Sequence, residues 1–279
     1  HGGGQNRFSW KNTGQILASR GKHVIAMDSR GHGDSDYSPT ANYAVETLSA
    51  DVQQVLLQIG RPVVLIGASM GGLTGILAAH EAGAEVVTKL VLVDVVPRFE
   101  KHGSARIRDF MFNHVHGFDS LEQAADAVAA YLPHRPRPRS VEGLKKNLRL
   151  RDGRWYWHWD PSFIRGDDRN EARIQDKDRL GAAATHVTVP TLIVRGGKSD
   201  VVSDETIGET LELATEDVSA AADRLIESWG DLKPADIAEQ IHDLSPQRRA
   251  EVAAALDDDT LADVLQELPE DDQVEIMAT

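Results

Sequence analysis

A serine between two glycines marks the sharpest turn that this sequence predicts. The segment Gly67-Ala-Ser-Met-Gly71 directly follows the apolar, β-branched run Val63–Ile66 and directly precedes a stretch with helical spacing, Gly72–Ala84. A turn between a strand and a helix forces Ser69 into a strained backbone conformation, and the glycines let the two elements pass close to each other. The Ser69 hydroxyl is then presented at the carboxyl end of the strand, which makes it a candidate nucleophile. The same glycines are also compatible with a packing turn that has no chemical role.

Short apolar runs alternate with longer helical stretches through the first three quarters of the chain. Such runs suit strands that are covered on both faces, as in a parallel α/β sheet. The predicted strands are His23–Met27, Val63–Ile66, Leu90–Val93 and Thr191–Val194, and the predicted helices are Tyr43–Ile59 and Gly72–Ala84. Residues of about 98–185 interrupt the alternation, and we expect them to form a helical, cap-like insertion over a ligand site. Trp155, Trp157 and Trp159 within it share either one face of a strand or a lid surface.

Charge and composition divide the chain in two. Residues 214–279 hold 18 acidic and 4 basic side chains, which accounts for the whole net charge of −14, and they include one of the 23 glycines. We therefore expect an α/β domain over residues 1–213 and an all-helical acidic domain over residues 214–279. The negative charge disfavours nucleic acid as a partner, and the absence of cysteine excludes disulfides and thiolate metal sites. With no signal peptide and no membrane span in the sequence, we expect a cytoplasmic protein.

A nucleophilic serine needs hydrogen-bond donors that stabilise the oxyanion formed on the substrate. The backbone N–H of Met70, the residue after the nucleophile, is one candidate donor. The opening segment His1-Gly-Gly-Gly4 can supply the other, because its glycines allow the backbone to approach closely, and we expect this donor to be Gly3. A glycine run at the end of a chain is also compatible with flexible backbone that has no role.

Four motifs in sequence resemble the α/β-hydrolase fold superfamily over about residues 1–213. They are His1-Gly-Gly-Gly-Gln5, Asp28-Ser-Arg-Gly-His-Gly-Asp-Ser35, Gly67-Ala-Ser-Met-Gly71 and Arg195-Gly-Gly-Lys-Ser-Asp200. The resemblance implies a serine hydrolase with Ser69 as nucleophile and Asp200 as the acid that orients a histidine, with Asp94 as the alternative acid. It implies a small ester-like acyl substrate and no cofactor, and esterase, lactonase, carbon–carbon hydrolase and haloperoxidase-like activities all stay open. We interpret His32 as a residue that shapes a turn beside the site.

A serine hydrolase of this kind uses a triad of serine, acid and histidine, in which the histidine is the base. This histidine has no clear counterpart in the sequence. After Asp200 the chain contains one histidine, His242, which lies in an amphipathic helical segment of the acidic region. The resemblance implies that the first strands of the fold and its last strand, last helix and catalytic histidine are missing. We therefore expect impaired activity, with His242 as a remote candidate base. We also expect the outer strands to expose unpaired edges and to promote self-association.

The acidic region contains an internal repeat with an offset of 24 residues. Ile237-Ala-Glu-Gln-Ile-His-Asp-Leu244 aligns with Leu261-Ala-Asp-Val-Leu-Gln-Glu-Leu268, which predicts a stacked helical repeat. Its pattern resembles the N-terminal cytosolic domain of MgtE-type magnesium transporters. That resemblance implies a response to Mg²⁺, for which Asp257–Asp259 and Glu270–Asp272 are candidate carboxylates. Such clusters are more often solvated turns and helix N-caps.

Three hypotheses for the whole chain follow. The first is a partial α/β-hydrolase sheet with a cap insertion, working as a serine hydrolase through Ser69 and Asp200. The second is a magnesium-sensing regulatory segment attached to an inert hydrolase fold. The third is a non-functional fusion of two truncated domains.

Overall fold

The computed structural model describes residues 1–133, 137, 140–165, 177–211, 226, 229, 232–242, 244, 246–269, 272–273 and 276. The chain divides into two compact units, His1–Thr210 and Leu211–Thr279, which are described separately below. The boundary that the sequence predicts between residues 213 and 214 lies outside the described residues. Among the described helices, none is both long enough and apolar enough to cross a bilayer.

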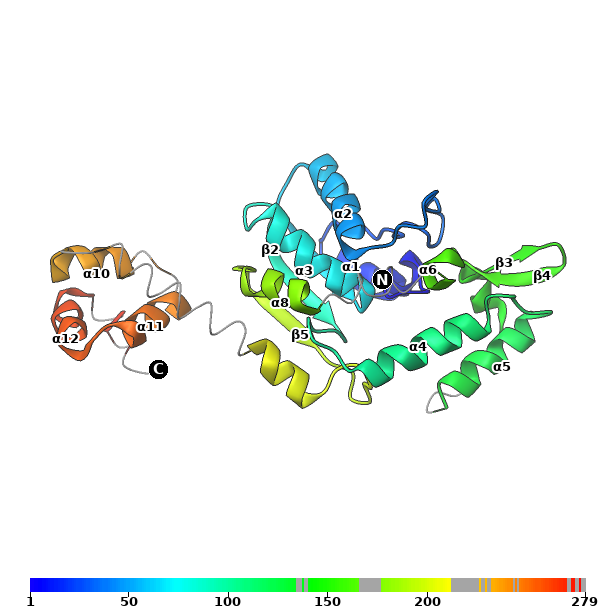
Figure 1. Ribbon diagram of the computed structural model, residues 1–279. Helices are drawn as coiled ribbons and strands as arrows, with labels where there is room; N and C mark the ends of the chain where they lie inside the picture. The colour runs from blue at the N-terminus through cyan, green and yellow to red at the C-terminus, as the bar shows by residue number, and fades with distance from the viewer. Residues whose placement is uncertain are drawn as a thin grey trace. The chain divides into compact units, whose positions relative to one another are not determined.

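A parallel three-stranded sheet forms the centre of the first unit (Figure 1). Its strands are β1 (Val63–Ala68), β2 (Val87–Val93) and β5 (Thr191–Val194), in the order β1-β2-β5. The predicted parallel α/β architecture is therefore present. The strand predicted at His23–Met27 is not, because this segment makes no ladder hydrogen bonds with any described strand. An apolar run becomes a strand only where a neighbouring strand accepts its backbone groups.

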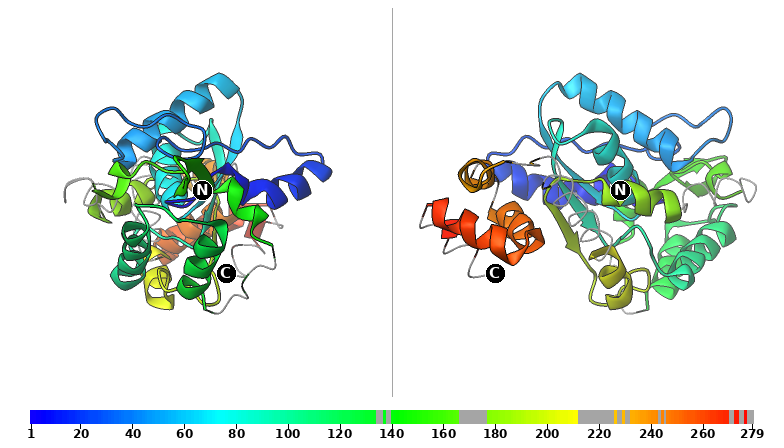
Figure 2. Two further views of the ribbon diagram at one scale, coloured as in Figure 1. Left: turned by 90° about the vertical axis from the view of Figure 1, so that its right-hand side faces the viewer. Right: turned by 60° about the vertical axis from the view of Figure 1, so that its left-hand side comes forward.

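Three helices cover one face of this sheet (Figure 1, Figure 2). They are α2 (Val45–Ile59), α3 (Met70–Ala82) and α8 (Lys177–Thr185), and both α2 and α8 pack on α3. Helix α3 is apolar nearly all round because its small residues lie between the sheet and the two other helices. The core contains Leu56, Ile76, Leu90, Leu92 and Leu180. Helix α8 therefore belongs to the core, although the sequence places it at the end of the insertion.

The opposite face of the sheet exposes apolar side chains. Side chains at paired positions of neighbouring strands point to the same face, and this rule groups Val64, Leu192 and Val194 on the face away from α3. Their side chains are 52%, 58% and 43% exposed, respectively. β1 and β5 are also the edge strands of the described sheet. An uncovered apolar face that runs to an open edge favours association.

We expect the chain to self-associate through this face. Replacing Leu192 and Val194 together by Lys places two charges on the exposed β5 side chains, which should shift the purified protein to monomer. The matched control is Leu57→Lys, because Leu57 is 73% exposed on α2, on the helical side of the sheet. Size-exclusion chromatography with light scattering measures the change. Equal masses for wild type and the double variant would contradict this role of the sheet face.

The insertion contains a β-hairpin in addition to helices. Its elements are α4 (Lys101–Asn113), α5 (Leu121–Tyr131), the 3-10 helix η2 (Glu142–Lys146), β3 (Leu148–Arg151), β4 (Arg154–Trp157) and the short α6 (Ser162–Arg165). Asp152 and Gly153 connect the antiparallel strands, and both have positive φ, as a tight hairpin turn requires. Trp155 and Trp157 lie on β4, whereas Trp159 follows it and is buried. The opening segment continues into η1 (Arg7–Trp10) and α1 (Lys11–Ser19).

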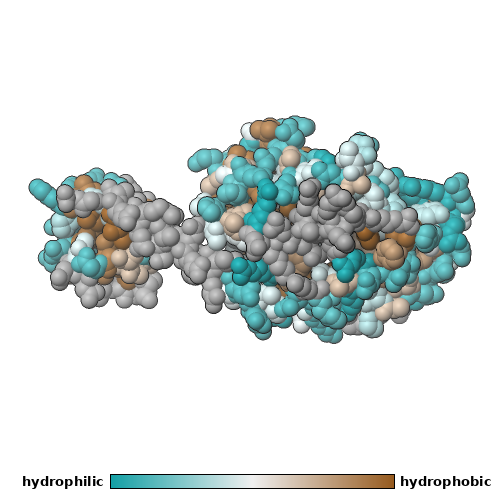
Figure 3. Space-filling model, in the orientation of Figure 1, coloured by the Kyte–Doolittle hydropathy of each residue, from teal (hydrophilic) through white to brown (hydrophobic). Residues whose placement is uncertain are grey.

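The second unit packs three short helices around its own core. They are α10 (Pro234–His242), α11 (Pro246–Ala255) and α12 (Asp258–Glu267). The 24-residue repeat places Ile237 and Ile241 of α10 in register with Leu261 and Leu265 of α12, and all four side chains belong to one apolar cluster. Figure 3 shows apolar side chains between the polar ones on the visible face of this unit. The repeat in the sequence is therefore a repeat of core positions.

Candidate active site

Ser69 lies in a strained turn between β1 and α3. Its backbone has φ of 47° and ψ of −120°, a conformation that residues with a side chain rarely adopt. A Cβ atom on Gly67 would overlap the carbonyl oxygen of Gly71, so the strand and the helix can pass each other only with glycine at position 67. Ser69 is partly exposed, and its hydroxyl makes no hydrogen bond to the residues that the structure describes. The predicted elbow is present at this position.

The opening glycines lie directly beside this elbow. The N–H of Gly71 donates to the carbonyl oxygen of His1 at 3.0 Å. A Cβ atom on Gly2 would stand 3.4 Å from the Cβ of Ser69, and one on Gly71 would stand 2.8 Å from the backbone of His1. The structure therefore brings the opening segment against Ser69.

Two backbone N–H groups at this place have no partner among the described residues. The N–H of Gly2 donates to Oε1 of Gln5 at 3.1 Å, and the N–H of Gly4 donates to Nε2 of His32 at 3.0 Å. The N–H of Gly3, between them, and the N–H of Met70, in the first turn of α3, have no described hydrogen-bond acceptor. One of these donors lies in the segment that contacts Ser69 and the other in the residue that follows it, and an oxyanion needs two such donors.

A buried, neutral histidine fixes the shape of the opening loop. His32 is completely buried, its Nδ1 lies 3.1 Å from the carbonyl oxygen of Arg30, and its Nε2 accepts the Gly4 N–H. These partners assign the proton to Nδ1. Burial lowers the pKa of His32 to about 4, against weaker raising effects of the Arg30 carbonyl, Asp28 and Asp160. The sequence-based interpretation of His32 as a turn-shaping residue agrees with this geometry.

Asp28 holds the same loop from the other side, a role that the sequence analysis missed. Its carboxylate accepts hydrogen bonds from the backbone N–H of Arg7 at 2.6 Å and from that of Asp34 at 3.0 Å, and it pairs with the Arg7 guanidinium. A Cβ on Gly33 would overlap this carboxylate. The sequence could have indicated this contact, because Asp28 and Gly33 lie five residues apart in one short loop.

The two candidate acids lie in the loops after β2 and β5. Asp94 directly follows β2, has φ of 54°, and accepts the Gly196 N–H at 3.0 Å through Oδ1. It is next to Val93, whose carbonyl oxygen accepts the Ser69 N–H at 3.1 Å. Asp200 lies in the loop after β5, and its Oδ2 is 3.3 Å from Nε of Arg106 on α4. Each carboxylate keeps one oxygen that could orient an imidazole.

Histidines close to the opening loop are unsuited to act as the base. Both ring nitrogens of His32 are bonded, and those of His1 face the Gly2 carbonyl at 2.9 Å and the Ser29 N–H at 3.0 Å. His242 lies in the second unit, where its Nδ1 is 2.6 Å from Oδ2 of Asp272. In the described part of the first unit, no imidazole is hydrogen-bonded to Ser69.

The cap contributes an apolar wall beside the opening glycines. A Cβ on Gly3 would stand 3.4 Å from the ring of Phe163 in α6, and one on Gly4 would stand 2.9 Å from Cε of Met111 in α4. Both side chains belong to a cluster with Val115 and Trp159. This apolar wall therefore contacts the opening loop at Gly3 and Gly4.

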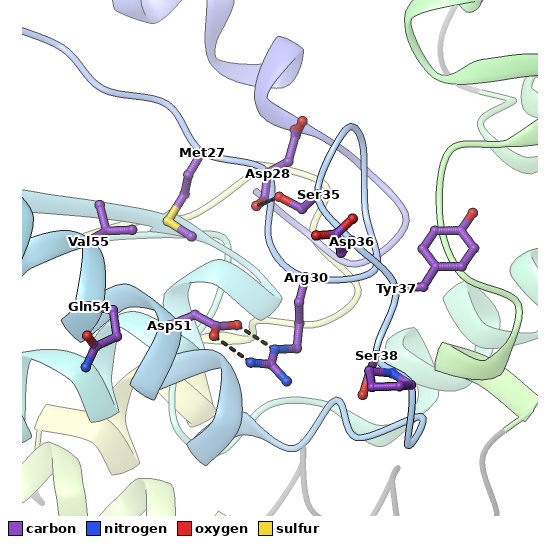
Figure 4. A pocket seen from close by; sticks show the side chains of 11 residues that line it. Met27, Asp28, Arg30, Ser35, Asp36, Tyr37, Ser38, Asp51, Gln54 and Val55 are labelled. Atoms are coloured by element: carbon purple, nitrogen blue, oxygen red, sulfur yellow. Dashed lines mark hydrogen bonds and ion pairs between the residues drawn. The ribbon is translucent and has the colours of Figure 1, made fainter.

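A separate pocket of about 530 Å³ lies between the loop of residues 27–39 and α2. Figure 4 shows that the double ion pair between Arg30 and Asp51 crosses it, with both distances 2.5 Å. Its lining includes Met27, Asp36 and Val55, but Ser69 is not part of it. This pocket therefore does not hold a substrate for Ser69.

Two carboxylates of the acidic clusters in the second unit make structural contacts. Of the two acidic clusters, the structure describes the side chains of Asp257 and Asp272. Asp257 caps α12 by accepting the Thr260 N–H at 3.0 Å. Asp272 accepts from His242 and pairs with Arg249, and these partners, His242 first, lower the pKa of its carboxyl. The side chains of Asp258, Asp259, Glu270 and Asp271 lie outside the described residues. Within the described ranges no group of three or more acidic or histidine side chains is arranged to hold a metal.

Two segments of the chain, one in each unit, match known families. Residues 1–216 match the family model of the α/β hydrolase fold, and residues 232–279 match that of the MgtE intracellular N domain. The first match spans most of the chain, and the second covers the three described helices of the second unit.

Curated relatives of the first unit hydrolyse esters according to their names. An esterase of Mycobacterium tuberculosis is 33% identical over 223 residues, which cover 77% of this chain and 70% of the esterase. An sn-1-specific diacylglycerol lipase and protein phosphatase methylesterase 1, both of Mus musculus, are 40% and 32% identical over 35% and 45% of this chain. The chain spans about a third of the length of these two relatives, 31% and 34%.

Solved structures give the same picture of the fold. A crystal structure of the M. tuberculosis esterase superimposes with a TM-score of 0.59 at 31% identity, covering 76% of this chain and 70% of that chain. An E-2-(acetamidomethylene)succinate hydrolase superimposes with a TM-score of 0.62 at 23% identity, covering 76% and 77%. The second likeness concerns the fold alone.

Proposed function

Because the chain belongs to the α/β hydrolase fold family, we propose that its first unit is a serine esterase that acts on small acyl esters through Ser69. The observation that carries this proposal is the strained serine beside two unpaired N–H groups, those of Gly3 and Met70. A packing turn without chemical role requires neither the strain nor the free donors. The names of the relatives, an esterase, a lipase and a methylesterase, support the same reaction class.

In the proposed reaction Ser69 Oγ attacks the ester carbonyl carbon while a base takes the hydroxyl proton. The carbonyl oxygen becomes an oxyanion that accepts hydrogen bonds from Gly3 and Met70. The tetrahedral intermediate expels the alcohol, which receives the proton, and water then hydrolyses the acyl-Ser69 ester by the same steps. No cofactor takes part in this scheme. The base is the one group that the described residues of the first unit do not supply, so we expect slow turnover by this chain.

Asp200 is the acid that we assign to orient the base, and Asp94 is the alternative. Asp200 follows the third strand of the described sheet, and beside its Arg106 contact its second oxygen has no partner among the described residues. Asp94 is nearer to Ser69 along the strand ends, but one of its oxygens is committed to the Gly196 N–H. Comparing Asp200→Asn with Asp94→Asn in the presence of imidazole as external base separates the two assignments, because only loss of the acid that orients the imidazole should lower the rate.

Covalent labelling tests the proposed nucleophile directly. In the presence of imidazole as external base, a fluorophosphonate probe is expected to modify the chain once, on the peptide that contains Ser69, as read by mass spectrometry after digestion. Ser69→Ala should lose the label, whereas the control Ser19→Ala should keep it, because the Ser19 hydroxyl only bonds the Ile16 carbonyl on exposed α1. Labelling that persists in Ser69→Ala would place the reactive group elsewhere and contradict the proposal.

A further inference from the structure

We infer that Phe163 limits the length of the acyl chain and restricts the esterase to short acyl groups. This inference rests on the proposed function, because it assigns the substrate class of the same site. Phe163 lies in α6 of the cap, remote in sequence from Ser69, and neither the family matches nor the motifs point to it.

The first argument is the order of contacts along the opening glycines. Gly2 faces Ser69, Gly3 faces the ring of Phe163 and Gly4 faces Met111, at added-Cβ distances of 3.4, 3.4 and 2.9 Å. An ester whose carbonyl oxygen reaches the Gly3 N–H has one of the two substituents of its carbonyl carbon beside the ring that covers Gly3, and we assign that substituent as the acyl chain. The space next to the oxyanion loop is filled by protein atoms in van der Waals contact, which leaves room for few methylene groups.

The second argument is that this ring cannot easily move away. Phe163 packs edge-on against His32 and Tyr43, with ring centroids 4.9 and 5.6 Å apart. Both partners are completely buried in the α/β unit. A wall that is fixed on two sides excludes a longer substrate instead of yielding to it.

The third argument is a buried polar anchor at the start of α6. The carboxylate of Asp160 accepts the hydroxyl of Tyr43 and, at 2.9 Å, the N–H of Ser162. The Asp160 N–H donates to the Gly31 carbonyl at 2.7 Å, and its own carbonyl accepts the Phe163 N–H at 2.9 Å. Burial, followed by the hydrogen bond to Asp160, raises the pKa of Tyr43 to about 12, so this hydroxyl stays a donor at neutral pH. Asp160 is thus a positioning residue for Phe163.

The kinetic test compares p-nitrophenyl acetate, butyrate and octanoate, in the presence of imidazole as external base. Wild type is expected to prefer acetate and butyrate. Phe163→Ala should raise the ratio of kcat/KM for octanoate over butyrate by about tenfold or more, because several methylene groups gain a place. The matched control is Phe112→Ala, which removes the same ring from a position on α4 that is 55% exposed, and it should leave this ratio unchanged.

A binding test separates this inference from the proposed function. On a Ser69→Ala background, which removes the nucleophile, octanoate binding is measured by calorimetry with and without Phe163→Ala. Octanoate should bind at least about fivefold more tightly when Phe163 is truncated, and butyrate should bind about equally to both proteins. This result would support the acyl-length role even if wild type and Ser69→Ala hydrolysed esters at the same rate.

Two outcomes overturn the inference. One is a chain-length preference that is the same in wild type, Phe163→Ala and Phe112→Ala. The other is tighter octanoate binding in the Phe112 variant but not in the Phe163 variant. Thermal unfolding of each variant verifies that it is folded, and Phe163→Leu, which keeps apolar packing at α6, replaces Phe163→Ala if the latter unfolds.

Discussion

Imidazole in solution is expected to accelerate ester hydrolysis by this chain and to have no such effect on Ser69→Ala. A positioned general base contributes about 10²–10⁴-fold to catalysis, and a freely diffusing imidazole should recover about 10–100-fold of it. The reason is that the structure shows a strained serine and two N–H groups without a described acceptor, but no described imidazole that bonds to the serine. The measurement is the release of p-nitrophenol from the acetate ester at increasing imidazole concentrations.

Without imidazole, wild type and Ser69→Ala are expected to differ by only a few fold. Members of a catalytic triad act as a unit, so removing a second member after the first is lost costs little more. Equal rates in the absence of imidazole would therefore not argue against Ser69 as nucleophile. The informative quantity is the difference in rate between wild type and Ser69→Ala after imidazole is added.

Three results discriminate among the hypotheses for the first unit. Rescue of wild type and of the control Ser19→Ala, but not of Ser69→Ala, supports the proposed esterase. A high rate without imidazole that depends on Ser69 would show that a base is already present, and His242→Ala would then be tested. Rates that never depend on Ser69, with or without imidazole, would contradict the serine mechanism.

Local patterns in the sequence predict the elbow and the parallel sheet because their causes are local. Glycines at positions 67 and 71 are needed where a strand and a helix cross, and that need is visible in the five residues from Gly67 to Gly71. The strand predicted at His23–Met27 shows the limit of this reasoning. Its apolar pattern is correct for a strand, but pairing depends on a neighbour that local pattern does not reveal.

The cap contains one feature that a local sequence pattern indicates and one that no local pattern indicates. Asp152-Gly153 between two alternating runs is a strong hairpin sequence, and it would have located β3 and β4. The contact between Tyr43 and Asp160 has no such local sign, because 117 positions separate them. The apolar wall beside the opening glycines could therefore be found only from the structure.

His32 links the acid stability of the protein to the geometry of the opening loop. Its imidazole is buried, and its neutral form holds the Gly4 N–H. Burial lowers its pKa from 6.5 to about 4. Between these two values the unfolded chain binds a proton at this residue that the native protein excludes, so acidification favours unfolding.

We therefore expect the free energy of unfolding to fall by about 3 kcal/mol through His32 as the pH drops from above 6.5 to about 4. His32→Gln, whose amide oxygen can still accept the Gly4 N–H, should lose this dependence. The control His116→Gln changes an exposed histidine of the cap and should keep it. Urea unfolding followed by tryptophan fluorescence at pH 7.5, 6 and 5 measures the slopes.

Only the comparison with His32→Gln can assign the pH dependence of the unfolding free energy to His32, because a second histidine also lowers the stability as the pH falls. Burial, followed by the charge of Arg149, lowers the pKa of His158, so some acid sensitivity should remain in His32→Gln. The ion-paired carboxylates Asp34 and Asp272 have lowered pKa values, so their contribution is lost only at lower pH, as they become protonated. Equal slopes in wild type and His32→Gln between pH 7.5 and 5 would show that the proton is taken up elsewhere, and that His32 is not the buried neutral support of the loop.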